Sequence, residues 1–429
     1  MRFRFFIFIL FPFVLANVAF SQKVWKFDFG PGRAAKDFKQ IEASDIYNKE
    51  KGYGFEPGAT VECIDRGGKN LLFSDLCASD KPFYFSVAVP EGNYRVTITF
   101  GDKSRETKTT VKAELRRLML EEIETKKGGF VRKTFIVNVR TPQIAGGGEV
   151  KLKEREKTTE WWAWDEKLTL EFNNSRPSVA AVEIEKAEDL PTVFLLGDST
   201  VCDQPREPYA SWGQMVTRFF RPTVAIANHA ESGESLRSSF GAKRLDKVLS
   251  LIKPGDYLLI QYGHNDEKEK GEGVGAMTTY KASLKKFVEE TRRKGGVPVL
   301  ITPMHRRTFD GNEKITNSHG DYPEAVRQVA REEKVALIDL TDLSKDFYEA
   351  LGRERSGAAF KEGDGTHHNN YGAYELAKMI AAEIKKQNLP LAKFLIKGLP
   401  RFDPKKPDPV ESFALPASPL ATDVKPLGN

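Results

Sequence analysis

The chain has 429 residues, of which 40% are hydrophobic and 29% are charged, and its formal net charge is +6. This length favours two domains, and the composition is typical of a soluble globular protein. Because the 66 Lys and Arg residues are interspersed with 60 Asp and Glu residues, the sequence argues against nucleic-acid binding but is compatible with a polyanionic substrate.

Residues 1–21 have the pattern of an export signal. Two arginines precede an apolar run, residues 5–16, that is too short to span a bilayer comfortably. Ala19 and Ser21 are the small residues expected just before a cleavage point at Gln22. We therefore expect a protein exported to the periplasm or the extracellular space, with no membrane span after cleavage. An uncleaved membrane anchor is the alternative.

Residues 22–187 contain short runs in which apolar and polar residues alternate. Such runs bury alternate side chains when they are extended, and they are separated here by Gly-rich turns. Many short strands at this spacing predict a β-sandwich or jelly roll. The segment 110–126 fits a helix or a strand. The clearest alternating runs are 24–29, 83–89, 94–100, 133–139 and 168–172.

The three cysteines are distributed unevenly between the two parts of the chain. Cys63 and Cys77 lie in the first part and could form a disulfide in an exported protein. Cys202 would then remain as a buried thiol.

Residues 191–397 alternate apolar strands with amphipathic helices. This alternation predicts an α/β domain with a five-stranded parallel sheet and helices on both faces, and ligands bind beyond the carboxyl ends of such strands. Residues 398–429 are Pro-rich and non-periodic, which predicts a draped or mobile tail. Strands are expected at 193–198, 223–227, 257–262, 297–302 and 335–340, and helices near 211–220, 280–294, 322–334 and 371–387.

Side chains and backbone groups suited to acyl transfer follow the first three of these strands. Ser199 comes directly after the first strand, where a serine is exposed and backbone N–H groups can face an anion. Gly233 and Asn265 follow the second and third strands. The Gly233 N–H and the Asn265 amide can donate hydrogen bonds to the same substrate oxygen as the Ser199 N–H.

Asp364 and His367 come just before the last predicted helix. At this spacing the carboxylate can accept a hydrogen bond from Nδ1 while Nε2 stays free to face Ser199. The sequence therefore predicts a triad of Ser199, His367 and Asp364. A metal site formed by Asp364, His367 and His368 is a weaker alternative, because the side chains of adjacent histidines diverge unless the loop bends.

Four blocks, in this order and at this spacing, resemble those of the SGNH, or GDSL-type, hydrolase superfamily. The resemblance implies a three-layer flavodoxin-like domain and ester hydrolysis without a metal or other cofactor. It also implies that Ser199 is the nucleophile, that Gly233 and Asn265 complete the oxyanion hole with the Ser199 N–H, and that Asp364 and His367 complete the triad. The blocks are Gly197–Thr200, Ser232–Ser235, Gly263–Asp266 and Asp364–His367.

Longer stretches around these blocks resemble rhamnogalacturonan acetylesterases, which remove O-acetyl groups from pectin. Thr200, in place of the usual leucine, is part of this narrower resemblance, as are Ala230–Phe240, Gln261–Asp266 and Thr302–Arg306. The first part, beginning at Trp25–Gly32, is similar to the galactose-binding-like β-sandwich that precedes some bacterial members. The implied partner is an acetylated pectic polysaccharide or oligosaccharide, and the oligomeric state is not predicted.

Candidate substrate-binding residues lie on loops at the expected active face. Arginine suits carboxylate recognition because its guanidinium forms a fork of two hydrogen bonds. Cys202, Tyr209 or Trp212 could line a small acetyl pocket. The candidates for substrate binding are Asp198, Arg237, His305 and Arg306.

Two alternative functions remain at this point. One is an acetylesterase acting on xylan or small esters. The other is a catalytically silent carbohydrate-binding protein whose β-sandwich holds the glycan. Three tryptophans of the first part, Trp161, Trp162 and Trp164, could bind sugar or belong to the core.

Overall fold

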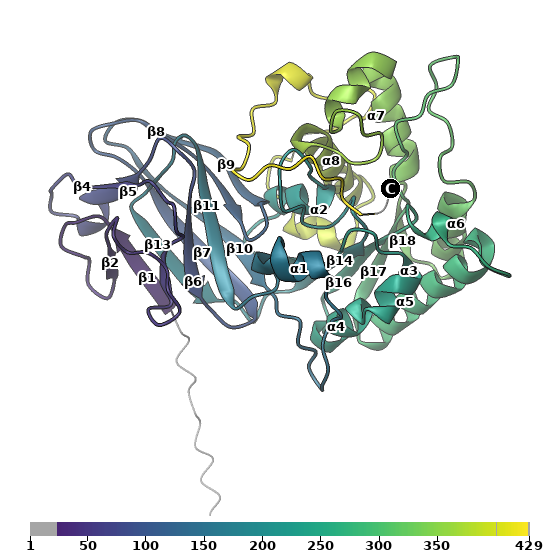
Figure 1. The fold of residues 1–429 in the computed structure, drawn as a ribbon, viewed down its shortest axis with the longest axis horizontal. Helices are drawn as coiled ribbons and strands as arrows, with labels where there is room; N and C mark the ends of the chain where they lie inside the picture. The colour runs from purple at the N-terminus through teal and green to yellow at the C-terminus, as the bar shows by residue number, and fades with distance from the viewer. Residues whose placement is uncertain (1–23, 400, 428–429) are drawn as a thin grey trace, which may run out of the picture.

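The computed structural model describes residues 24–399 and 401–427 (Figure 1). A β-rich domain lies on one side of the molecule and an α/β domain on the other, and they are in contact along one broad face. The predicted export signal lies outside the described residues. None of the helices in the described part of the chain is long and apolar enough to cross a membrane.

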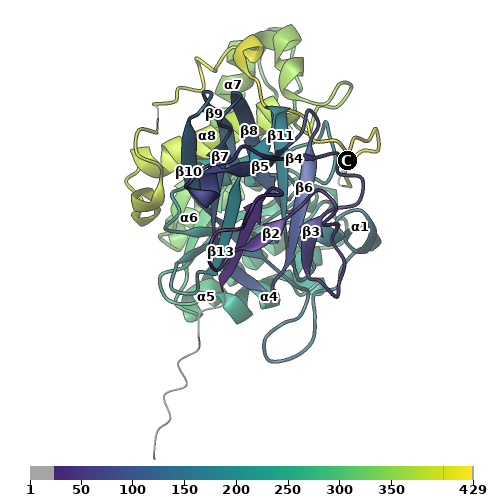
Figure 2. The same cartoon turned by 90° about the vertical axis from the view of Figure 1, so that its left-hand side faces the viewer.

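The β-rich domain is built mainly from two five-stranded sheets (Figure 2). Their strand orders are β10-β7-β13-β1-β2 and β3-β6-β11-β8-β9, and a smaller sheet has the order β12-β5-β4. The strands are β1 (Val24–Phe29), β2 (Lys39–Ile41), β3 (Tyr53–Phe55), β4 (Glu62–Asp65), β5 (Asp75–Ala78), β6 (Phe83–Ala88), β7 (Gly92–Gly101), β8 (Thr107–Ala113), β9 (Arg117–Thr125), β10 (Phe130–Val139), β11 (Lys167–Arg176), β12 (Ser178–Val179) and β13 (Ala181–Lys186).

Alternating side chains of both large sheets form a common core, as the sequence predicts for a sandwich. In β7, Tyr94, Val96 and Ile98 are fully buried, whereas Arg95 and Thr97 between them are only half-buried. Residues from both large sheets belong to one hydrophobic cluster. Aromatic rings in that cluster meet edge to face, an arrangement that adds stability beyond the buried area.

The segment 110–126 is extended and forms most of β8 and β9, which settles the ambiguity of its sequence. Strand β9 has apolar residues on both faces at its start, Leu118–Leu120, because this part of the strand lies between two cores. Its Met119 packs into the sandwich, and the neighbouring Leu118 packs into the core of the α/β domain. A strand covered on both sides lacks the alternation by which a strand is recognised.

Cys63 on β4 and Cys77 on β5 are paired residues of adjacent antiparallel strands and form a disulfide. Cys202 is a buried free thiol in the α/β domain. This is the arrangement expected from the distribution of the cysteines.

The α/β domain contains the predicted five-stranded parallel sheet, in the order β15-β14-β16-β17-β18. Hydrophobic clusters lie on both of its faces. The strands are β14 (Thr192–Gly197), β15 (Ala225–Asn228), β16 (Tyr257–Gln261), β17 (Val297–Ile301) and β18 (Ala336–Ile338). The helices are α2 (Trp212–Met215), α3 (Leu236–Gly241), α4 (Arg244–Leu251), α5 (Lys281–Arg293), α6 (Tyr322–Glu332), α7 (Leu340–Arg355) and α8 (Asn370–Lys386).

Three of these helices, α3, α4 and α7, are absent from the sequence prediction. The predicted helix at 211–220 is also shorter, because α2 gives way to a 3-10 turn at Val216–Phe219. The strand order reverses at β14, which has β15 on one side and β16 on the other. In open sheets of this kind the ligand crevice lies at that reversal, beyond the carboxyl ends of the strands.

The end of the chain is draped over both domains (Figure 1). Ser418 is buried and its Oγ donates to the carboxylate of Glu171 on β11. Further along, Glu207 and the tail pair as two short extended segments: the Glu207 N–H donates to the Leu420 carbonyl, and the Thr422 N–H donates to the Glu207 carbonyl, each at 2.8 Å. The tail is therefore anchored up to Thr422.

Candidate active site

Strand β14 ends at Gly197, where a side chain cannot be accommodated. A Cβ on this residue would lie 2.5 Å from Cγ2 of Val201 and 2.6 Å from the Gln261 carbonyl oxygen. The chain then makes a tight turn in which the N–H groups of Val201 and Cys202 donate to the Asp198 carbonyl, each at 3.0 Å. This turn presents Ser199 at the carboxyl edge of the sheet.

Ser199, His367 and Asp364 are brought together although 168 positions separate the serine from the histidine. The Ser199 Oγ lies 2.9 Å from His367 Nε2, and His367 Nδ1 lies 2.9 Å from Asp364 Oδ2. The second Asp364 oxygen accepts hydrogen bonds from the backbone N–H groups of Thr366 and His367. Burial raises the pKa of the Asp364 carboxyl, but these hydrogen bonds outweigh it and hold that pKa below its usual range.

The two other predicted oxyanion donors lie on the loops after β15 and β16. Gly233 has a φ of +75°, a conformation that favours glycine. The Asn265 amide donates one N–H to the Glu234 carbonyl at 2.9 Å, which ties the two loops together and leaves its second N–H available. Asp266 adds a second link by accepting from the Leu236 N–H at 2.9 Å, and burial raises its pKa to about 8.

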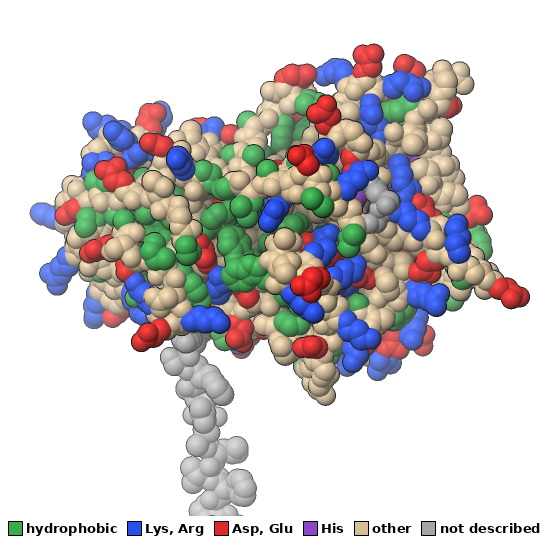
Figure 3. Space-filling view, viewed as in Figure 1, with side chains coloured by type: hydrophobic (Ala, Val, Ile, Leu, Met, Phe, Trp, Pro, Cys, Tyr) green, Lys and Arg blue, Asp and Glu red, His purple; other side chains and the backbone are tan. Residues whose placement is uncertain are grey.

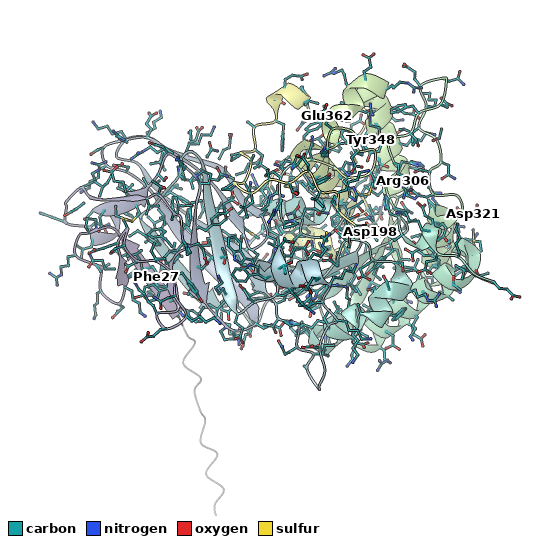
Figure 4. All side chains as sticks on the ribbon, in the orientation of Figure 1. Phe27, Asp198, Arg306, Asp321, Tyr348 and Glu362 are labelled. Atoms are coloured by element: carbon teal, nitrogen blue, oxygen red, sulfur yellow. A yellow bond between two sulfur atoms is a disulfide. The ribbon has the colours of Figure 1, made fainter. Side chains whose placement is uncertain are left out.

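Asp198, predicted to bind substrate, is fully buried and makes its hydrogen bonds within the protein; Figure 4 labels its place in the α/β domain. Its Oδ1 accepts hydrogen bonds from the N–H and the Oγ1 of Thr200, at 2.9 and 2.7 Å. Its Oδ2 lies 3.3 Å from Nδ1 of His264. An aspartate directly after the strand therefore braces the turn from inside.

The other three predicted substrate-binding residues are placed differently from one another. His305 is buried, and the Arg306 side chain pairs with Glu267 and donates to the His264 carbonyl. Arg237 is exposed on α3. Of these three, only Arg237 keeps an exposed guanidinium that has no ion pair in the described part of the chain.

His368 faces away from Ser199, which bears on the alternative metal site. Its Nε2 lies 2.7 Å from the hydroxyl of Tyr348, in the interior of the domain (Figure 4). The adjacent His367 faces Ser199 instead. Among residues 24–399 and 401–427, no three His, Cys, Asp or Glu side chains are grouped so that they could hold a metal ion.

The three residues predicted as possible walls of an acetyl pocket, Cys202, Tyr209 and Trp212, are placed differently. Trp212 is fully buried, and its Nε1 donates to the Gln261 side chain at 2.8 Å. Tyr209 lies beside the site instead, with its ring edge-on to the His367 ring at 5.9 Å between centroids. Cys202 is buried, with its Sγ 3.3 Å from the Ser232 Oγ.

Residues that brace the site from the β-rich domain escape sequence reasoning altogether. Lys153 donates to the Ser232 carbonyl, and Arg155 donates to the Ser232 Oγ at 3.0 Å, so both hold the loop that carries Gly233. From the other side, Gln204 donates to the Ser199 carbonyl at 2.7 Å. Lys153 and Arg155 stand in a charged run of the sequence, and because such runs are usually solvated, the run does not indicate this role.

The last described residues of the tail lie against the same groups. A Cβ placed on Gly233 would lie 2.9 Å from the Cβ of Leu427, so this leucine packs directly on Gly233. The Lys425 Nζ lies 3.7 Å from Asp364 Oδ2. With the tail in place, Ser199 and His367 are each only 2% exposed.

Comparison with known proteins identifies both domains. Residues 195–376 match the model of the GDSL-like lipase/acylhydrolase family, and residues 25–133 match that of the β-agarase/YXIM esterase-like, galactose-binding domain-like family. Over 48% of this chain and 94% of its relative, the sequence is 40% identical to rhamnogalacturonan acetylesterase RhgT of Bacillus subtilis. The chain belongs to the GDSL-like lipase/acylhydrolase family. It is a carboxylic ester hydrolase with an N-terminal galactose-binding-like domain.

Two further similarities extend over both domains of this GDSL-like hydrolase. The uncharacterized esterase YxiM of Bacillus subtilis is 29% identical over 86% of this chain and 93% of its own length. A crystal structure of YxiM from Bacillus subtilis covers 86% of this chain and 99% of the YxiM chain, at 28% identity and a TM-score of 0.47.

Replacing the amide of Asn265 tests the oxyanion site of this GDSL-like hydrolase. We expect Asn265→Ala to lower kcat for p-nitrophenyl acetate by about 10²- to 10³-fold with little change in KM, because the lost donor acts on charge that develops in the transition state. The exposed loop variant Asn312→Ala should keep full activity. An Asn265→Ala enzyme within threefold of the unaltered one would contradict the assignment.

The position of the tail leads to a second expectation. A chain ending at Thr422 retains the tail's anchors but lacks Lys425 and Leu427, which cover Asp364 and Gly233. We expect this truncation to raise kcat/KM for a polymeric acetyl ester by about tenfold, with an unchanged unfolding temperature. Lower activity after truncation, measured as acetate release, would mean that the tail contributes to catalysis.

Proposed function

We propose that this hydrolase removes O-acetyl groups from pectic polysaccharide of the rhamnogalacturonan type by acyl transfer through Ser199, His367 and Asp364. The observation that carries the proposal is the continuous hydrogen-bonded chain from the Ser199 Oγ through the His367 ring to the Asp364 carboxylate. This arrangement supplies a nucleophile, a base and a group that orients the base.

In the first half of the reaction His367 Nε2 takes the Ser199 hydroxyl proton as Oγ attacks the acetyl carbonyl carbon. Asp364 holds Nδ1 protonated, so that Nε2 is the free base, and stabilises the imidazolium that forms. The negative carbonyl oxygen accepts hydrogen bonds from the N–H groups of Ser199 and Gly233 and from the Asn265 amide. The bond to the sugar oxygen then breaks, and that oxygen takes the proton from Nε2, leaving acetyl-Ser199.

In the second half a water molecule repeats the same cycle. His367 Nε2 takes one proton from the water, whose oxygen attacks the acetyl-serine carbonyl. The same three donors stabilise the second oxyanion. Its collapse releases acetate, and Nε2 returns the proton to the Ser199 Oγ. The chemistry uses only groups of this chain and water.

Two observations favour an acidic glycan over other acetyl esters. The relative of 40% identity is named a rhamnogalacturonan acetylesterase, and the similarity spans nearly the whole of that protein. The hollow beside the catalytic groups is lined by Arg206, which has no ion pair with the described residues. A neutral acetylated xylan would not use this cation, so xylan esterase activity is the second candidate.

Comparing substrates tests the proposal. Acetate release should be measured from acetylated rhamnogalacturonan and from acetylated xylan at equal acetyl concentration, with p-nitrophenyl acetate as a small ester. We expect kcat/KM to be at least tenfold higher for rhamnogalacturonan. A preference for xylan would replace the substrate assignment, and absence of hydrolysis with all three esters, accompanied by glycan binding, would indicate a carbohydrate-binding protein.

We further propose that the reaction takes place outside the cytoplasm, in the periplasm or the extracellular space of a bacterium. The leader-like residues 1–21 support export. The Cys63–Cys77 disulfide is also of a kind that persists in oxidising compartments. Fractionation of cells, followed by an immunoblot, would test this location.

A further inference from the structure

A hollow of about 490 Å³ lies between the two domains, beside the catalytic groups. Its walls come from residues 153–160 of the β-rich domain, residues 204–209 of the α/β domain, and residues 422–427 of the tail. Its volume lies within the range of small-molecule sites. Lys and Arg side chains gather around the end of the described tail on this face of the molecule (Figure 3).

The hollow adjoins the nucleophile through several of its lining residues. Tyr209 stands edge-on to the His367 ring, and Gln204 donates to the Ser199 carbonyl. Leu427 lies against Gly233. A sugar whose acetyl group reaches Ser199 would therefore extend into this hollow.

A second hollow, of about 130 Å³, continues from the first toward the β-rich domain. Both are lined by Thr159, Pro205 and Arg206, and the second is also lined by Trp161 and by Trp162. The two hollows adjoin at these shared residues and are here called together the interdomain groove, with the catalytic groups beside the first hollow and the two tryptophans beside the second.

Arg206 is the cation of the interdomain groove that is available to a ligand. The other cations that line the groove face carboxylates: Lys153 is paired with Glu234, Arg155 with Glu231, Arg116 with Glu207 and Lys425 with Asp364. Arg206 is half-buried and makes no ion pair or side-chain hydrogen bond with the residues that the structure describes. An arginine without a partner is suited to bind a carboxylate in the two-pronged manner.

Trp161 supplies the second element of a sugar site. It is 43% exposed, the highest value among the described tryptophans, whereas Trp162 packs edge-on against Tyr84. The Lys167 Nζ lies 4.5 Å from the centre of the Trp161 ring and holds it in place. A tryptophan at the end of a groove offers a flat apolar surface to the C–H face of a sugar ring.

We propose that Arg206 and Trp161 form a subsite of the interdomain groove that binds an acidic sugar residue next to the acetylated one. Arg206 pairs with the uronate carboxylate, and Trp161 packs against a neighbouring sugar ring. The inference rests on the proposed function and deepens it, because it makes the β-rich domain part of the substrate site. It also gives a physical reason for the selection of an acidic glycan over a neutral one.

Binding to a variant that cannot turn over tests the subsite separately from catalysis. In the Ser199→Ala background, titration calorimetry would measure the Kd of an unesterified rhamnogalacturonan oligosaccharide and of a neutral xylo-oligosaccharide of equal length. We expect Arg206→Ala to raise the Kd for the acidic oligosaccharide by five- to tenfold, and Arg206→Lys to restore only part of it. The matched control is Arg105→Ala, an exposed arginine of the β-rich domain that lines neither hollow, and it should leave that Kd unchanged.

Two results would overturn the subsite. One is an unchanged Kd for the acidic oligosaccharide in Arg206→Ala, and the other is an equal loss of affinity for the neutral oligosaccharide. Trp161→Ala should also weaken binding of the acidic oligosaccharide, by about fivefold, and an unchanged Kd would remove Trp161 from the site. If the unaltered enzyme released no acetate from rhamnogalacturonan, the proposed function would fail, but these binding results would still decide the subsite.

Discussion

Ser199→Ala is expected to abolish ester hydrolysis while leaving the fold intact. The serine Oγ is the group that forms the acyl intermediate, and loss of the nucleophile from comparable triads costs on the order of 10⁵- to 10⁶-fold in kcat. The hydroxyl adds little to the fold, because among the described groups Oγ is hydrogen-bonded to His367 Nε2 alone. Hydrolysis of p-nitrophenyl acetate by purified protein provides the measurement, and the unfolding temperature should change by no more than about 2 °C.

A matched control makes this result specific. Ser250→Ala removes a hydroxyl on helix α4 whose one hydrogen bond with the described residues goes to the Lys247 carbonyl, and this variant should retain full activity. The variant Ser199→Cys is a second check, since a thiol at this position can form an acyl intermediate but is not matched to a site built for serine. Full activity of Ser199→Ala would show that the acyl group is carried elsewhere.

Arg244→Met is expected to destabilise the protein by about 3–5 kcal/mol, the cost typical of breaking a buried ion pair. Arg244 on α4 and Glu156 on α1 (Glu154–Thr158) belong to different domains and are both fully buried. Two hydrogen bonds join them, at 3.0 and 2.6 Å, and Glu234 lies 3.4 Å from the same guanidinium. Removing Arg244 leaves the buried Glu156 carboxylate without its main partner and leaves Glu234 with Lys153 alone of its two cations. Urea unfolding followed by circular dichroism measures the loss.

The exposed ion pair between Arg331 and Glu324 provides the contrast. Arg331→Ala should change the free energy of unfolding by no more than about 0.5 kcal/mol, because solvent screens such a pair. Replacing both partners of the buried pair, as Arg244→Met with Glu156→Leu, should recover part of the lost stability. A loss for Arg244→Met as small as that for Arg331→Ala would mean that the interface has relaxed around the substitution.

The sequence predicts the parallel sheet well because its strands are short apolar runs between turns. It fails on α3 and α4, which are six and eight residues long and meet at Lys243, where the backbone is left-handed. Helix α7 follows β18 after a single residue, so its start is hidden by the preceding strand signal. Strand β9 was ambiguous because its two faces belong to different cores.

In the candidate site, too, some residues could be predicted from local sequence, whereas the positions of others depend on packing between distant segments. Ser199, Asp364 and His367 were predicted because each stands in a short block, and the structure brings their side chains within hydrogen-bonding distance. Asp198 is adjacent to Ser199 in the chain, yet it faces the interior, and no pattern of neighbouring residues indicates which way a side chain points in a tight turn. The bracing role of Lys153 depends on contact between domains and leaves no local signal.

The contact between the two domains also determines how this enzyme can be divided. Two arginines of the β-rich domain hold the 203–209 loop: Arg116 donates to the Gln204 and Tyr209 carbonyls, at 3.1 and 2.7 Å, and Arg117 lies 3.4 Å from the Asp203 carboxylate. The α/β domain resembles a relative of which the match covers 94%, so that relative consists almost entirely of this domain. If the α/β domain of the present chain were produced alone, it would lose the cations that neutralise Asp203 and fix the loop. We expect the full chain to melt in a single calorimetric transition, as one cooperative unit rather than as an enzyme with a detachable accessory.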